Sequence, residues 1–210
     1  MEGFDDLEKR LDAFVPAQGY RHDQYIAMCI REALAAAKEG NFGVGAVLVH
    51  NGQVVQKGHN HVFHPYFQSD RHAEMDVITT VEQKRKGNHL MHKGYTLYTS
   101  VEPCTMCFAR LITAGVGQVY YAADDSEGGM VHLAGNLPSA WKGILAGSGA
   151  TFEAASCSPG LKELAMDVFL TTVRQLDKSL AQTQGDSKTL ESSITPPLPP
   201  ANEKVRKGFA

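Results

Sequence analysis

Two short segments of the sequence constrain the fold more than any other feature: His72-Ala73-Glu74 and, farther along the chain, Pro103-Cys104-Thr105-Met106-Cys107. One imidazole and two thiolates are three of the ligands that a tetrahedral Zn²⁺ ion takes, so a fold that uses them must bring the two segments together. A structural zinc site normally has four protein ligands, whereas a hydrolytic site leaves one position to water. The pattern therefore predicts a hydrolytic zinc site, with Glu74 placed to move protons to and from that water.

Each half of this pattern is weak alone. A lone Cys-x-x-Cys also occurs in redox pairs and structural zinc knuckles, and a His-x-Glu occurs by chance in many helices. A thioredoxin-like role would leave His72 and Glu74 without a function, and papain-like catalysis would not need a second cysteine. The combination, with a proline before the first cysteine, favours a zinc site whose ligands are His72, Cys104 and Cys107.

The composition sets wider limits. With 210 residues, 43% of them apolar, the chain can bury one good core, and a net charge of −3 gives no overall basic field for nucleic acid. Four cysteines are too few for a disulfide scaffold. The N-terminus lacks the pattern of a secretory signal, and no apolar run approaches the ~18 residues of a membrane span. These observations predict a cytoplasmic protein with no membrane partner.

The periodicity of apolar residues predicts helices and strands in alternation. Asn51-Gly52 supplies the positive φ angles of a type I′ turn, which indicates a β-hairpin between 44–49 and 54–57. Ser69-Asp70 is the expected N-cap of a helix that runs to about Gln83. The other expected helices are 4–14, 26–37, 104–114 and one from Pro159, and the other expected strands are 95–99, 118–122 and 151–155.

This order predicts an α/β fold with a mixed sheet whose first pair of strands is antiparallel. His72 and Glu74 are then expected in the first turn of one helix, and Cys104 and Cys107 in the first turn of another. Cysteines at positions i and i+3 share a helix face, and the positive end of the helix dipole favours their thiolate forms. Both sulfurs can therefore reach one ion.

Three regions are expected along the chain. Residues 1–20 form a short lead-in that is expected to be helical, residues 21–180 form the zinc-containing domain, and residues 181–210 form a tail. The tail has few apolar side chains and a cluster of prolines at Pro196-Pro197-Leu198-Pro199-Pro200, so it is predicted to be disordered.

Over roughly residues 22 to 180 the sequence resembles the cytidine deaminase-like superfamily, and within it the tRNA adenosine deaminase and guanine deaminase branch. The segments that carry the resemblance are Phe42–Val49, Gly58-His59-Asn60, Arg71–Met75 and Val101–Cys107. It implies a three-layer α/β/α fold with a five-stranded sheet, Zn²⁺ as cofactor and assembly as a homodimer. It also implies that Glu74 is the catalytic acid and base and that Asn60 contacts the base.

Two departures bear on the substrate. Bacterial tRNA deaminases have Ala-Arg-Asp where this chain has Ala123-Asp124-Asp125. Their last helix is strongly basic, whereas the corresponding segment 161–180 of this chain has only three cations: Lys162, Arg174 and Lys178. These differences favour a free nucleobase or nucleoside as substrate, with a tRNA adenosine deaminase as the alternative. A non-catalytic zinc protein is a third possibility, which the intact Glu74 opposes.

The remaining candidates are less specific. Glu102 is given no chemical role beyond bracing its loop, and the segment 125–145 is expected to shape the pocket. His59, His61 and His64 are interpreted as loop or pocket residues rather than ligands. Residues 84–86 are the one compact basic cluster. Four aromatic residues are candidates to stack on a base, and each could equally be a core residue: Phe42, Phe63, Tyr66 and Phe108.

Overall fold

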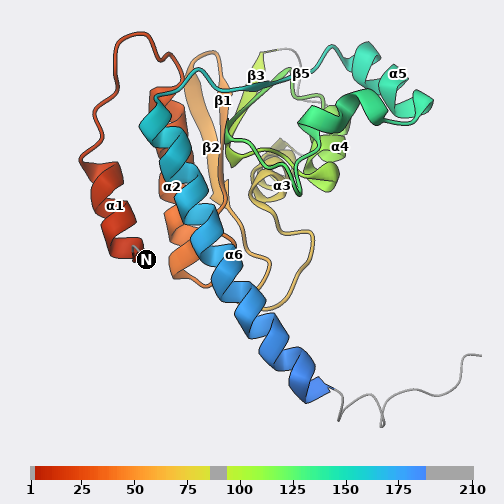
Figure 1. The fold of residues 1–210 in the computed structure, drawn as a ribbon. Coiled ribbons are helices and arrows are strands. Elements are labelled where there is room, and N and C mark those ends of the chain that lie inside the picture. Colours follow the sequence, from red (N-terminus) through yellow and green to blue (C-terminus); the bar gives the residue numbers. More distant parts are fainter. Residues whose placement is uncertain (1–2, 86–93, 188–210) are drawn as a thin grey trace, which may run out of the picture. The chain divides into compact units, whose positions relative to one another are not determined.

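The computed structural model describes residues 3–85 and 94–187, with side chains as far as residue 176. The chain divides into one unit of residues 1–174 and another of residues 175–210. The first unit contains the whole sheet and the helices that cover it (Figure 1). The predicted tail beyond residue 187 lies outside the described residues.

Helices and strands alternate along the chain much as the sequence predicts. The helices are α1 (Phe4–Asp12), α2 (Asp23–Lys38), α3 (Ala73–Arg85), α4 (Thr105–Ala114), the 3₁₀ helix η1 (Val131–Asn136), α5 (Ser139–Ser148) and α6 (Pro159–Ser187). The strands are β1 (Gly45–His50), β2 (Gln53–His59), β3 (Tyr95–Val101), β4 (Gln118–Ala123) and β5 (Thr151–Ala154).

The five strands form one mixed sheet in the order β2-β1-β3-β4-β5. Strand β1 pairs antiparallel with both β2 and β3, whereas β3–β4 and β4–β5 are parallel. Asn51 and Gly52 have φ angles of 51° and 77°, as the predicted β1–β2 hairpin requires. The prediction of an α/β fold with a mixed, five-stranded sheet is therefore confirmed.

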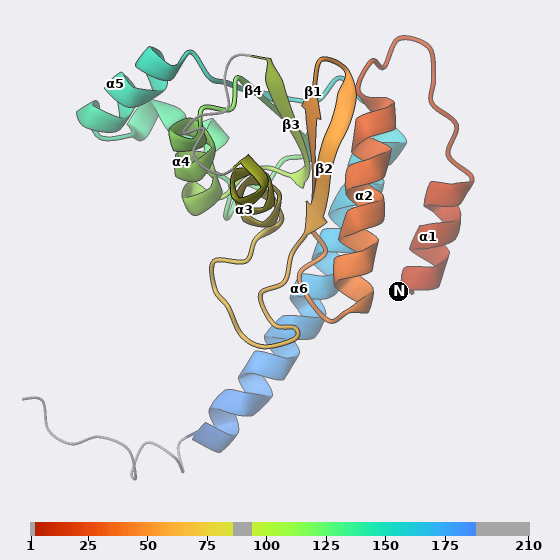
Figure 2. The same ribbon diagram turned by 180° about the vertical axis from the view of Figure 1, so that it is seen from behind.

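Helices cover both faces of this sheet (Figures 1 and 2). Because side chains alternate along a strand, β1 contributes Val47 and Val49 to a core shared with α1, α2 and α6. The same strand sends Ala46 and Leu48 to a second core with α3 and α4. The two cores lie on opposite faces, which confirms the three-layer arrangement.

The lead-in 1–20 contains a helix, as expected, and this helix packs on the domain. Leu7 and Leu11 of α1 are buried in the core beside α2 and α6. Around them, Lys38 of α2 lies 2.5 Å from Glu8, and Arg31 lies 2.8 Å from Asp12. Exposed ion pairs of this kind contribute little, so the two buried leucines supply most of the attachment.

The structure corrects three boundaries. Helix α3 begins at Ala73, not after Ser69-Asp70, because the carbonyl of His72 accepts the first helical hydrogen bond, from Asp76 N. Helix α6 continues to Ser187, so the predicted start of the tail at 181 falls inside a helix. The segment 125–145, for which no element was predicted, contains η1 and the start of α5.

One glycine of β1 fixes the distance between the sheet and α2. A Cβ at Gly45 would collide with the carbonyl oxygen of Cys29 and lie 2.5 Å from the backbone nitrogen of Ala33. Gly45→Ala must therefore push α2 away from the sheet, and we expect a loss of at least about 1–3 kcal/mol in the free energy of unfolding. Denaturant unfolding will measure it.

Gly143→Ala, inside helix α5, is the matched control for this prediction. A Cβ at Gly143 meets nothing within 4 Å. Alanine is the better helix former, so this variant should be neutral or slightly stabilised. Equal unfolding midpoints for Gly45→Ala and the wild type would contradict the close approach of strand and helix.

Candidate active site

Two helix starts bring the motif residues together. The carbonyl oxygen of His72 accepts a hydrogen bond from Asp76 N at 2.9 Å, and that of Cys104 accepts one from Phe108 N at 2.8 Å. Both residues are therefore N-caps, one position before the first turns in which they were predicted. Glu74 and Cys107 lie inside those first turns. Cys104 does not use its side chain to cap α4, and its thiol instead contacts the imidazole of His72.

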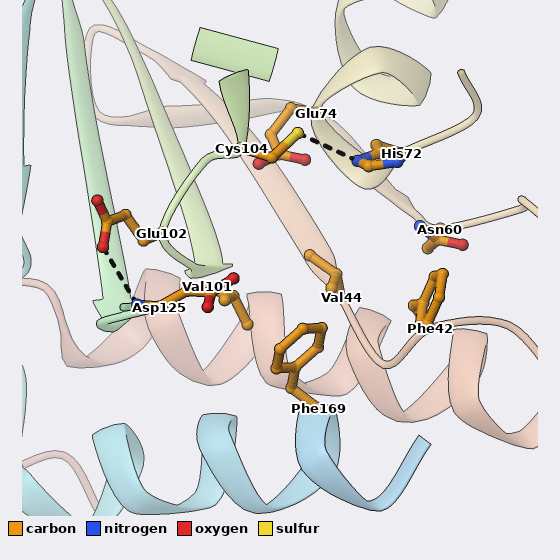
Figure 3. A pocket seen from close by; sticks show the side chains of 10 residues that line it. All are labelled: Phe42, Val44, Asn60, His72, Glu74, Val101, Glu102, Cys104, Asp125 and Phe169. Carbon is orange, nitrogen blue, oxygen red and sulfur yellow. Dashed lines mark hydrogen bonds between the residues drawn. The ribbon is translucent and has the colours of Figure 1, made fainter. Parts of the chain in front are cut away.

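The three predicted ligands form one cluster. The nitrogen of His72 and the sulfurs of Cys104 and Cys107 all lie within 4.8 Å of one another. His72 Nδ1 is 3.6 Å from Cys104 Sγ, and Figure 3 shows this pair. One imidazole and two thiol sulfurs are a donor set that suits zinc and leaves an open coordination position. The residues present therefore fit a hydrolytic metal site.

The electrostatics of the two cysteines support the same interpretation. Cys107 hydrogen-bonds to Cys104, and together with the neighbouring His72 this lowers the pKa of Cys104 to about 4. The pKa of Cys107 is raised by its interaction with Cys104 and by burial. The pair thus holds one thiolate beside an imidazole, and the thiolate is the form that binds metal.

Glu74 lies beside this cluster and is almost completely buried, with 4% of its surface exposed. Its Oε2 accepts a hydrogen bond from Cys107 Sγ at 3.4 Å. Burial raises the pKa of Glu74, and the negative charge of Cys104 raises it further. A carboxyl group in these surroundings takes up a proton more readily than one in water, as a proton-transfer group must.

The cluster and Glu74 lie at one end of a pocket of about 180 Å³ (Figure 3). Both predicted substrate-binding residues, Asn60 and Phe42, line it. Loops next to the strand ends form most of the wall, together with residues of two helices, α3 and α6. The lining residues are Phe42, Val44, Asn60, His72, Glu74, Val101, Glu102, Cys104, Asp125 and Phe169.

Asn60 and Phe42 are held in place by local hydrogen bonds and packing. The buried Asn60 accepts a hydrogen bond from Val62 N on its Oδ1 at 3.0 Å, which fixes the side chain. Phe42 packs edge-on against Phe63, with ring centroids 5.3 Å apart. The backbone nitrogen of Phe63 donates to Asn41 Oδ1 at 2.8 Å, so this loop is tied to the segment that carries Phe42.

Glu102 braces the opposite wall, as predicted, and also lines the pocket. Its carboxylate accepts hydrogen bonds from Asp125 N at 3.1 Å, from His132 N at 3.0 Å and from His132 Nδ1 at 2.9 Å. Burial alone would raise the pKa of Glu102, but these hydrogen bonds hold it below its usual value. The charged carboxylate thereby fixes the start of the segment 125–145 against the pocket.

Phe169 is the pocket residue that sequence reasoning missed entirely. It comes from α6, far from the motif in sequence, and reaches the pocket across the end of the sheet (Figure 3). Gly43 N donates to Thr172 Oγ1 of the same helix at 2.8 Å, which ties α6 to the loop before β1. The helical spacing of apolar residues in α6 does not indicate that Phe169 lines the pocket and is not packed in the core.

Two of the aromatic stacking candidates lie elsewhere. Phe108 is 1% exposed and packs against Phe152 with ring centroids 4.3 Å apart, so it is a core residue. Tyr66 is 65% exposed on the loop before α3 and is not among the residues that line the pocket. Of the two interpretations that the sequence leaves open for Phe108, its burial supports the core residue.

A three-layer sheet that joins a His-x-Glu and a Pro-Cys-x-x-Cys at two helix starts defines a zinc-dependent deaminase fold. The chain matches the family model for the cytidine and deoxycytidylate deaminase zinc-binding region over residues 20–123. The protein belongs to this deaminase family, in agreement with the resemblance seen in the sequence.

Its relatives include enzymes that act on tRNA. The tRNA-specific adenosine deaminase of Bacillus subtilis is 37% identical over 105 residues, which are 50% of this chain and 63% of the relative. That of Aquifex aeolicus is 34% identical over 112 residues, 53% of this chain and 72% of the relative. The matched segment thus spans about two thirds of these proteins.

Among solved structures, the guanine deaminase from Nitrosomonas europaea covers 81% of this chain and 94% of its own, with 21% identity and a TM-score of 0.53. This likeness concerns the fold alone. Within the described residues, no helix has both the length and the apolar character that crossing a bilayer requires.

Proposed function

We propose that the protein is a zinc-dependent hydrolytic deaminase that replaces the exocyclic amino group of a nucleobase by oxygen and releases ammonia. The observation that carries the proposal is the buried carboxyl of Glu74, which lies beside the His72, Cys104 and Cys107 cluster in a pocket that Asn60 also lines. Two of the three metal ligands, His72 and Cys104, thus share one cavity with the proton-transfer group and the base-recognition group.

The residues that would hold the zinc are His72, Cys104 and Cys107. When bound, the zinc lowers the pKa of a water molecule so that a nucleophile is available near neutral pH. The arrangement of one thiolate beside one imidazole supports the assignment, since both are ligand forms that zinc takes.

Glu74 is the proton carrier in this proposal. It accepts one proton from the attacking water and delivers it to the ring nitrogen. It then takes the second proton from the new hydroxyl group and delivers it to the amino group, which leaves as ammonia when the carbon–nitrogen bond breaks. Its raised pKa, caused by burial and by the charge of Cys104, supports both directions of transfer, because this carboxyl holds a proton more readily than one in water. Burial keeps bulk water away from the transferred protons.

Asn60 and Phe42 would bind the base. An amide side chain offers both hydrogen-bond donors and an acceptor to the edge of a base. Here one lone pair of Asn60 Oδ1 is already used by Val62 N, so the amide group enters the complex with a fixed orientation. Phe42 supplies an aromatic face at the same pocket, backed by Phe63.

The charges around the pocket favour a small neutral substrate. Two acidic residues, Glu102 and Asp125, line the pocket together with Glu74. A carboxylate at the rim repels the phosphates of a polynucleotide, whose binding depends on neutralising cations. We therefore infer a free nucleobase or nucleoside as the substrate class.

The basic cluster of the sequence does little to change this preference. Lys84 donates to Gln56 Oε1 at 2.8 Å, and the guanidinium of Arg85 lies 4.7 Å from the centre of the Tyr95 ring. Both residues lie at the C-terminal end of α3, whereas the motif cluster lies at its N-terminal end. At a rise of about 1.5 Å per residue, the two ends of this helix are nearly 20 Å apart. Lys86 lies outside the described residues.

A tRNA adenosine deaminase is the second candidate, because the relatives that are 34–37% identical carry that name. Under this alternative the same Glu74 and zinc ligands act on an adenine presented by an RNA loop. Binding would then weaken steeply with salt, since each neutralised phosphate contributes to the salt dependence. Homodimer formation and a cytoplasmic location, both expected from the sequence, stay predictions.

Ammonia release from a panel of free bases, nucleosides, nucleotides and tRNA will decide between the two. We expect turnover of a base or nucleoside that changes little between low and moderate salt. Inosine formation in tRNA that is suppressed by moderate salt and lost in a Lys84→Gln/Arg85→Gln variant would overturn the substrate choice. Release from no member of the panel by zinc-loaded protein would favour the non-catalytic alternative.

A further inference from the structure

A second group of metal-ligating side chains includes the two histidines that flank Asn60 in the sequence. Glu39 is the C-cap of α2, His59 is the last residue of β2, and His61 lies in the loop that follows. One carboxylate oxygen and one nitrogen from each ring lie within 4.8 Å of one another. The deaminase mechanism uses none of these three residues.

The separations suit a common ion. Glu39 Oε2 is 3.1 Å from His59 Nε2 and 3.7 Å from His61 Nδ1. Ligands about 2.1 Å from a tetrahedral zinc lie about 3.4 Å apart, between the two observed values. The two rings are neighbours, with centroids 4.3 Å apart, and each turns one nitrogen toward the same carboxylate oxygen.

The opposite nitrogen of each ring meets another carboxylate. His59 Nδ1 is 3.2 Å from Glu32 Oε2, and His61 Nε2 is 3.8 Å from Asp76 Oδ2. Metal-binding histidines usually donate their second N–H to a carboxylate, which fixes the tautomer and the orientation of the ring. His59 has this outer carboxylate within hydrogen-bond distance, and His61 has one 3.8 Å away.

Each outer carboxylate is itself held by a cation. Lys57 Nζ lies 3.2 Å from Glu32 Oε1, and an Arg71 nitrogen lies 2.9 Å from Asp76 Oδ1. In both pairs one oxygen faces the cation and the other faces the histidine. The rings are therefore oriented by two parallel chains of contacts, in contrast to freely rotating surface side chains.

This arrangement creates a mismatch that a cation would resolve. If His59 donates its Nδ1 proton to Glu32, its neutral Nε2 is an acceptor, and it faces the acceptor Glu39 Oε2. If His61 carries its proton on Nε2, toward Asp76, its Nδ1 is likewise an acceptor that faces Glu39 Oε2. A positive charge is needed between the carboxylate and the two nitrogens, and a single ion supplies it to both rings.

We propose that Glu39, His59 and His61 form a second metal site, distinct from the motif cluster, that takes a divalent first-row transition cation such as Zn²⁺. Imidazole nitrogens suit zinc, copper and nickel better than calcium or magnesium, which prefer oxygen ligands alone. Three protein ligands leave room for water, as the half exposure of Glu39 permits. The ion would fix the backbone on both sides of Asn60.

Isothermal titration of Zn²⁺ into protein that already carries the motif zinc tests this site. We expect the wild type to bind a second zinc per chain. Glu39→Gln and His61→Gln should each abolish that step or weaken it more than tenfold. Glu32→Gln, which removes only an outer carboxylate, should weaken it about 10–100-fold.

Glu8→Gln is the matched control, because Glu8 is also a partly exposed glutamate paired with a cation, Lys38. It should bind the second zinc as the wild type does. Circular dichroism of every variant will show that the fold is kept, which the surface position of Glu39 favours. The proposal would be overturned if the wild type bound no second zinc, or if Glu39→Gln and His61→Gln bound it as tightly as the wild type. The cluster would then be an ion-pair network around a protonated His59.

Discussion

Replacing Glu74 by Gln is expected to lower kcat by at least about 10²–10⁴-fold while the zinc content and the fold stay unchanged. Glutamine has nearly the same size, so the buried position remains filled. It cannot accept a proton from water or deliver one to the ring nitrogen. Since one carboxyl is proposed to serve several transfers in each turnover, the loss should lie at the upper end of this range or beyond.

The measurement combines ammonia release with metal analysis and thermal unfolding of the same preparation. Glu163→Gln on the exposed side of α6 is the control for the loss of one carboxylate. It should keep the wild-type kcat. Wild-type turnover in Glu74→Gln would rule out the mechanism, whereas a drop in turnover with a parallel loss of zinc would assign Glu74 to metal binding instead.

Much of this site could be predicted because its functional residues occur in short local sequence motifs. The β1–β2 hairpin followed from Asn51-Gly52, whose positive φ angles few other residue pairs adopt. The convergence of His72 with Cys104 followed from donor chemistry, because a single zinc ion requires its ligands to meet. These inferences depend on residue type and spacing, which a sequence displays directly.

The parts that could not be predicted depend on contacts between distant segments. Phe169 has the helical spacing of a core residue, and only the packing of α6 over the sheet end directs it to the pocket. His59 and His61 were interpreted as loop residues because Glu39, Glu32 and Asp76 come from two other helices. The two histidines meet these carboxylates only in the folded protein, where β2 packs against both α2 and α3.

The helix starts show a smaller error of the same kind. Ser69-Asp70 has the residue types of an N-cap, yet α3 begins after His72, a poor capping residue. Capping preference contributes about 1 kcal/mol, and a metal ligand whose side chain must face the cluster can override it. Cys104 repeats the pattern at α4, which has no side-chain cap.

Removing one proposed zinc ligand is expected to have the second large effect. Cys104→Ala should lose most of the motif zinc and unfold at a clearly lower temperature than the wild type. Cys104 is only half-buried, so its truncation leaves a smaller cavity than truncation of the fully buried Cys107 would. Any large loss of stability in this variant therefore reports the metal more than the packing.

Cys157→Ala separates the two contributions, because Cys157 is buried in the core and far from the motif in sequence. It should lose some stability and keep its zinc. An ion that binds only the folded chain stabilises it by about 4 kcal/mol when present at a thousand times its dissociation constant. In the Glu39→Gln background, which lacks the second proposed site, a chelator should accordingly lower the Tm of the parent protein and of Cys157→Ala, but leave that of Cys104→Ala almost unchanged. Full zinc occupancy in Cys104→Ala, with a chelator effect equal to that of the wild type, would show that the motif cysteines are not the ligands.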